Sequence, residues 1–216
     1  MTTKDDRCRL VLVVPALDDM ERQAQLLEAA LAGGDVASVI LPQGTLDDQA
    51  FQKQAERLVP IIQAAGAAAL IAGDSRVASR VKADGLHISG NGEAVAEAVE
   101  KFTPKLIVGA GGAADRHQAL EIGEARPDYM FFGKLDGDIK PEAHPKNLAL
   151  GEWWASMIEI PCIVLGGSDL QSALAVAETG AEFVALRQAI FSAPAPGEAV
   201  AAVNALLDEK APRFED

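Results

Sequence analysis

The sequence of 216 residues contains little cysteine, few aromatic residues and an excess of acidic over basic side chains. Its two cysteines, Cys8 and Cys162, are too few for a disulfide framework or a cysteine metal site, and they favour a cytoplasmic protein. With 19 Lys and Arg against 32 Asp and Glu, the formal net charge is −13. Such a charge repels nucleic acids and anionic membrane surfaces, so neither is an expected partner. The apolar stretch 10–17 contains a proline and is too short to span a membrane.

Short apolar segments alternate with helical segments along the whole chain. The short segments are rich in Val, Ile and Leu, which is typical of strands buried on both faces of a parallel sheet. Capping residues such as Asp19 precede the helical segments, and Pro60 is expected to kink or break one of them. Strands are expected at 10–14, 36–41, 67–72, 85–88, 106–110, 129–132, 162–165 and 183–191, and helices at 18–31, 45–65, 75–82, 92–102, 115–125, 147–157, 170–180 and 196–207.

Eight short strands that alternate with eight helical segments predict an α/β fold, a single (β/α)8 TIM barrel that takes in residues 1–216 as one domain. An open doubly wound sheet is the structural alternative, but no G-x-G-x-x-G motif follows the first strand. In a barrel, the active site lies at the C-terminal ends of the strands. The residues that directly follow each strand are therefore the candidates for function.

Two glycines, Gly166 and Gly167, follow the strand at 162–165 and precede a helix that Ser168 or Asp169 can cap. Backbone N–H groups at such a turn can converge on an anion, and the helix dipole adds a partial positive charge. Barrel loops after the seventh and eighth strands often bind phosphate, which adds Gln188 to the candidate site. A plain tight turn explains the same glycines. Both interpretations stay open.

Five segments, in this order, resemble signatures of the thiamine-phosphate synthase family and of the related TenI-like thiazole tautomerases. They are LIAGD at 70–74, ADGLHI at 83–88, LIVG at 106–109, DYMFFG at 128–133 and IPCIVLGG at 160–167. The resemblance covers roughly residues 67–192. It implies a transferase that joins a hydroxymethylpyrimidine pyrophosphate to a thiazole phosphate and releases pyrophosphate with the help of Mg²⁺. The implied partners are small phosphorylated substrates.

The resemblance also implies roles for individual residues. Asp74 matches the family's metal-binding aspartate, and Glu93, or Asn91 as a neutral oxygen donor, is the candidate for a second Mg²⁺ ligand. Lys140 is the nearest substitute for the lysine of the family's Thr-Pro-Thr-Lys loop, where it would steady the departing pyrophosphate. A solvated loop lysine is the alternative interpretation. Asp136 and Asp138 are further candidate metal ligands in the same loop.

The chain departs from the family pattern at other strand ends. The family's Gln-x-Arg-x-Lys after the second strand has no counterpart in residues 39–44, which removes two cations. The family's Ser and His after the fifth strand fall at Gly111 and Ala113, which removes an acid/base histidine. Two hypotheses follow. The chain is either a divergent thiamine-phosphate synthase or a non-catalytic barrel of the same superfamily that binds a phosphorylated ligand.

Two further features concern packing and assembly. His87 alternates with buried residues in a strand and is expected to be a hydrogen-bonded core residue rather than a catalytic one. Trp153 and Trp154 are adjacent on the helix 147–157, and at least one of them is expected to cover the barrel exterior. That surface is a candidate contact for a homo-oligomer, because exposed aromatic residues favour interfaces.

Overall fold

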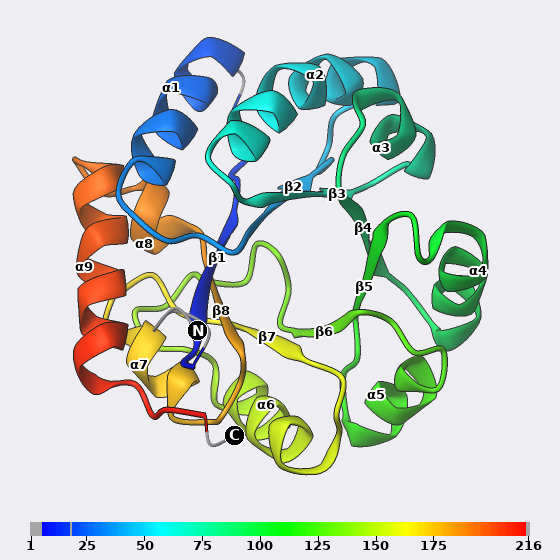
Figure 1. Cartoon of the computed structure of the whole chain (residues 1–216), viewed down its shortest axis with the longest axis vertical. Helices are drawn as coiled ribbons and strands as arrows, with labels where there is room; N and C mark the ends of the chain where they lie inside the picture. Colours follow the sequence, from blue (N-terminus) through cyan, green and yellow to red (C-terminus); the bar gives the residue numbers. More distant parts are fainter. Residues whose placement is uncertain (1–5, 18, 215–216) are drawn as a thin grey trace.

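The computed structural model describes residues 6–17 and 19–214, and its strands form a closed parallel barrel (Figure 1). Each strand pairs with the next, and the last pairs with the first, with Leu10 opposite Val184. The closed barrel confirms the predicted (β/α)8 fold and leaves no open sheet edge between the first and eighth strands. The strands are β1 (Arg9–Val13), β2 (Ser38–Pro42), β3 (Ala68–Ala72), β4 (Gly85–Ser89), β5 (Ile107–Gly111), β6 (Tyr129–Phe132), β7 (Cys162–Leu165) and β8 (Phe183–Leu186).

Helices surround the barrel and connect the strands (Figure 1). The first five begin at an Asp or Asn whose side chain accepts a hydrogen bond from the first turn, as with Asp19 and the N–H of Arg22 at 3.0 Å. The helices are α1 (Met20–Leu31), α2 (Asp48–Ala64), α3 (Ser75–Val81), α4 (Gly92–Phe102), α5 (Arg116–Gly123), α6 (Pro145–Met157), α7 (Ser172–Ala177), α8 (Gln188–Phe191) and α9 (Pro196–Lys210).

Three helices differ from the sequence prediction. α2 continues through Pro60 without a break. α7 begins at Ser172, later than predicted, because the N–H groups of Ser168 and Asp169 bond to the carbonyls of Lys140 and Pro141 instead of opening a helix. The predicted strand 183–191 is too long: β8 ends at Leu186, and the short helix α8 follows it and places the N–H of Gln188 at the barrel mouth.

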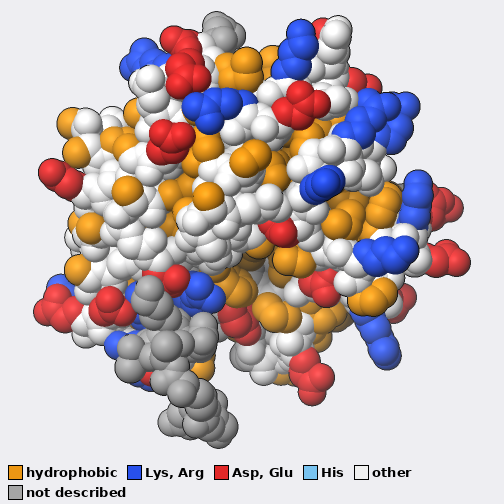
Figure 2. Space-filling model, turned by 45° about the horizontal axis from the view of Figure 1, so that its top comes forward, with side chains coloured by type: hydrophobic (Ala, Val, Ile, Leu, Met, Phe, Trp, Pro, Cys, Tyr) orange, Lys and Arg blue, Asp and Glu red, His pale blue; other side chains and the backbone are white. Residues whose placement is uncertain are grey.

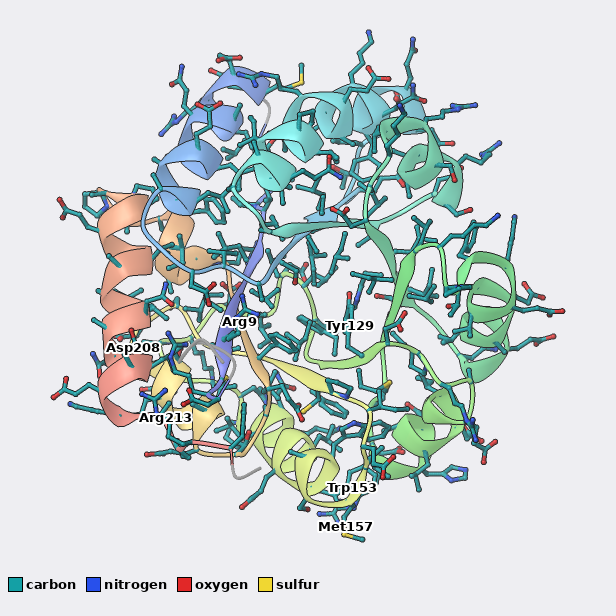
Figure 3. All side chains as sticks on the ribbon, in the orientation of Figure 1. Arg9, Tyr129, Trp153, Met157, Asp208 and Arg213 are labelled. Carbon is teal, nitrogen blue, oxygen red and sulfur yellow. The ribbon has the colours of Figure 1, made fainter. Side chains whose placement is uncertain are left out.

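The core has two layers, because side chains alternate between the two faces of each strand. Outward-facing residues pack against the helices, whereas the barrel interior is filled by a smaller cluster: Val11, Val13, Ile40, Leu70, Tyr129, Phe131, Ile163, Leu165 and Ala185. Tyr129 lies inside the ring of strands (Figure 3). His87 is buried beside it, with Nδ1 2.9 Å from the Tyr129 hydroxyl, as expected of a packed core histidine.

The two tryptophans divide between core and surface. Trp154 is buried and donates its indole N–H to the carbonyl of Ile160 at 2.7 Å. Trp153 lies on the outer side of α6 (Figure 3), partly exposed, with the guanidinium of Arg116 over its ring at 5.1 Å. One tryptophan thus covers the exterior, and its role in a homo-oligomer stays a prediction. Within the described ranges, none of the helices has the length and apolar character needed to cross a membrane.

Candidate active site at the barrel mouth

A cavity of about 690 Å³ opens where the carboxyl ends of the strands meet. His87 lines this cavity from β4, and burial lowers its pKa from 6.5 to about 4, so the ring is neutral at neutral pH. Arg187 therefore supplies the single positive charge among the lining residues. The lining residues are Val14, Pro15, Ala16, Pro42, Gly44, Thr45, Ala72, Gly73, His87, Ile88, Ser89, Leu135, Asp136 and Arg187.

The three candidate phosphate-binding N–H groups are all hydrogen-bonded within the chain. Gly166 donates to the carbonyl of Ala185 at 2.9 Å, and Gly167 donates to the Ser172 hydroxyl at 2.8 Å. Gln188 donates to the carboxylate of Asp138 at 2.6 Å. An anion at this turn therefore has to replace existing partners, and phosphate binding at Gly166, Gly167 and Gln188 stays a prediction.

Gly167 allows two loops to pack closely together and does not form an open anion-binding turn. A Cβ atom at this position would overlap the carbonyl group of Pro141. The segment after β6 thus lies directly on the turn after β7, and only glycine leaves room for it.

Asp138 and Arg187 form a buried ion pair at the mouth, which the sequence analysis did not identify. The Asp138 side chain is fully buried, and it accepts from Arg187 Nε at 2.8 Å and from a terminal guanidinium nitrogen at 2.6 Å. Arg187 also donates to the backbone carbonyl of Asp136 at 3.0 Å. The main cation of the cavity is thus already neutralised by a carboxylate of the chain. Asp138 was predicted only as a candidate metal ligand.

Asp74 lies at the end of β3, as predicted, but its carboxylate is engaged by its neighbour. It caps α3 by accepting from the N–H of Arg76 at 2.8 Å, and it also accepts from Arg76 Nε at 2.8 Å. These hydrogen bonds from the Arg76 side chain and backbone hold the pKa of Asp74 below its usual range. The carboxylate is therefore an anion that is paired with a cation of the same chain.

Glu93 and Asn91, the candidates for a second Mg²⁺ ligand, lie at the start of α4. Glu93 is exposed there, and the Asn91 side chain caps the helix by accepting from the N–H of Ala94 at 3.1 Å. No group of three or more His, Cys, Asp or Glu in the described part of the chain is arranged to hold a metal ion. The donor set does not fit a Mg²⁺ ion held by protein side chains alone. A Mg²⁺ role for Asp74 and Glu93 stays a prediction.

Lys140 lies on the loop between β6 and α6, where its carbonyl accepts from the N–H of Ser168 at 2.7 Å. Its side chain is exposed and does not line the mouth cavity. A second cavity of about 420 Å³ lies beside this loop, between the ends of β5 and β6 and the start of α6, and Lys134 and Lys146 contribute to its lining. Basic and acidic side chains lie close together on the face shown in Figure 2.

The family described as thiamine monophosphate synthase matches residues 10–190. The thiamine-phosphate synthase of Rhodospirillum centenum is 34% identical over 93% of this chain and 98% of its own length. The thiamine-phosphate synthase of Hyphomonas neptunium is 32% identical over 95% of this chain and 96% of its own length.

A solved structure agrees with the fold. The thiamine phosphate pyrophosphorylase from Pyrococcus furiosus superposes with a TM-score of 0.79 at 20% identity, covering 95% of this chain and 98% of that one. An identity this low supports the barrel fold alone. The family match and the two bacterial relatives show that the chain belongs to the thiamine monophosphate synthase family.

Proposed function

We propose that the chain is a divergent thiamine-phosphate synthase, which joins a hydroxymethylpyrimidine pyrophosphate to a thiazole phosphate and releases pyrophosphate. The family match over residues 10–190, together with curated relatives of that name over nearly their whole length, carries this proposal. The mouth cavity of about 690 Å³ supports it, because ligand pockets are typically about 300–1,000 Å³.

Charge at the mouth limits the proposed reaction. The leaving pyrophosphate gains negative charge as its bond to carbon breaks, and nearby cations have to offset that charge. Within this chain, Lys140 is the proposed catalytic cation, and Arg187 is the cation that lines the cavity. Loss of one well-placed donor costs about 2.7–4 kcal/mol, or about a hundredfold to a thousandfold in rate. Since the family's two strand-two cations are missing, we expect slow turnover.

A non-catalytic barrel that binds a phosphorylated ligand is the second candidate function. The engaged state of Asp74 favours it, because the Arg76 side chain already bonds the carboxylate that would hold a metal ion. Mg²⁺ is the cofactor of the first candidate only. When bound, it would offset charge on the pyrophosphate.

The two candidates are separated by an assay of the purified full chain with both thiamine precursors, with and without Mg²⁺, and with direct detection of the product. If the first holds, we expect measurable turnover that Asp74→Ala abolishes and Lys140→Ala reduces steeply. Asp115→Ala is a matched control, because Asp115 caps α5 through the N–H of Gln118 as Asp74 caps α3. Undiminished activity in Asp74→Ala would refute its metal role. No turnover, combined with binding of thiazole phosphate, would favour the second candidate.

A further inference from the structure

Asp138 bonds the groups at the barrel mouth that an anion would use. We propose that Asp138 is an internal competitor for the anionic group of a ligand, so that a phosphate binds Arg187 and the N–H of Gln188 only after the Asp138 carboxylate has left them. The inference rests on the proposed function only in placing a phosphorylated ligand at this mouth. It makes Asp138 a residue that controls the affinity for anions, although it transfers no proton and touches no reacting atom.

The carboxylate uses the donors that a phosphate would use. Arg187 offers Nε and a terminal nitrogen to one oxygen of Asp138, at 2.8 Å and 2.6 Å, and the N–H of Gln188 donates to the other oxygen at 2.6 Å. A guanidinium fork next to a backbone N–H binds carboxylate and phosphate in the same way. Because Asp138 occupies these three donor groups in a fully buried position, a second anion there would meet like charge and would have to compete with the carboxylate for them.

Asp138 belongs to the loop between β6 and α6 and not to a strand of the barrel. The segment 134–142 is tied down by backbone hydrogen bonds at its far end, from Ser168 to the Lys140 carbonyl at 2.7 Å and from Asp169 to the Pro141 carbonyl at 3.1 Å. Ile139, next to Asp138, is 75% exposed, whereas Leu135 near the start of the segment packs against the barrel interior. Withdrawal of Asp138 therefore breaks mainly the polar contacts around that residue.

A purely structural ion pair is the competing explanation. Removal of one partner of a buried pair destabilises a protein, because the other charge is left uncompensated. That explanation predicts a less stable variant whose affinity for anions is unchanged. The competitor explanation predicts that the freed guanidinium gains affinity for an added anion.

The test measures binding of inorganic phosphate and pyrophosphate to the full chain by calorimetry at low salt. We expect Asp138→Asn and Asp138→Ala to bind at least tenfold more tightly than the unaltered chain. Glu142→Gln removes one negative charge from the same segment at an exposed residue outside the cavity lining, and it should bind as the unaltered chain does. Adding Arg187→Gln to Asp138→Asn should abolish the gain. Equal affinity in the unaltered chain and both Asp138 variants would overturn the proposal, as would a gain that survives the loss of Arg187.

A crystal of the unaltered chain soaked in phosphate gives the answer without a variant, should the variants not fold. Phosphate bound to Arg187 while the Asp138 contact is intact overturns the proposal. Phosphate bound there with that contact broken supports it, whereas no phosphate at Arg187 at a saturating concentration counts against it, because a purely structural ion pair predicts the same empty site. Neither measurement uses turnover, so an inactive enzyme and a failed competitor are separate results.

Discussion

His87 should make the protein lose stability in mild acid. Its ring is buried at the base of the mouth, with Nδ1 2.9 Å from the Tyr129 hydroxyl and the Phe131 ring edge-on at 5.3 Å. Burial disfavours the charged imidazolium and lowers the pKa from 6.5 to about 4. In the pH window between these two values, the unfolded chain binds a proton at His87 that the folded chain does not. The free energy of unfolding therefore falls as the pH falls through that window.

The size of the effect follows from the two pKa values. At pH 7.5 both states hold a neutral His87, so the residue contributes no pH dependence. At pH 5 the unfolded state is almost fully protonated at this site and the folded state is mostly neutral, which amounts to a loss of about 2 kcal/mol. Carboxylates also titrate in acid, so this term is isolated by comparing the unaltered chain with a variant.

The comparison uses urea unfolding of the unaltered chain and of His87→Gln at pH 7.5 and pH 5. Gln keeps a polar side chain near Tyr129 but cannot take up a proton in this range. We expect the unaltered chain to lose about 2 kcal/mol more than the variant between the two pH values. Identical pH dependence in the unaltered chain and His87→Gln would refute the reasoning.

Two further predictions test packing inside and outside the barrel. Gly109→Ala should destabilise the fold by about 1–3 kcal/mol or more, because the added Cβ overlaps the Tyr129 ring; Gly90→Ala, with no atom nearer than 3.4 Å, is the control in the same denaturation assay. Trp154→Phe should cost about 1–3 kcal/mol, because the Ile160 carbonyl loses its 2.7 Å partner. Trp153→Phe, on the partly exposed neighbour, should cost clearly less, and equal losses in thermal melts would contradict the assignment of the buried hydrogen bond.

The barrel could be predicted because short stretches of sequence indicate its strands and helices. Strands buried on both faces leave continuous apolar runs, and the run at 162–165 coincides with β7. Caps such as Asp19 mark helix starts for the same reason, since the capping hydrogen bond spans three residues. The late start of α7 could not be predicted, because it depends on Ser168 bonding to the carbonyl of Lys140, which is distant in the chain.

In the candidate site, too, local features could be predicted from the sequence and contacts between distant residues could not. The glycines at 166 and 167 are visible in the sequence, and a two-glycine turn suggests an anion cradle. The contacts beside these glycines depend on residues that are far apart in the chain. Arg187 and Asp138 are 49 residues apart, and no local sequence pattern indicates that they form a pair. The position of Asp74 after β3 likewise predicts a metal ligand. In the structure, the side chain of Arg76 donates to the Asp74 carboxylate, so that the two residues form an ion pair.

The position of Lys140 links this ion pair to the chemistry of the proposed reaction. The mouth cavity presents one guanidinium, and Asp138 neutralises it. Lys140 is only two residues from Asp138 on the same loop, and its side chain is exposed. The Lys140 carbonyl is bonded by the N–H of Ser168, so a movement of the segment 134–142 repositions this lysine when that bond also breaks. We expect anion binding to break both contacts, so that release of Arg187 and a change in the position of Lys140 are coupled.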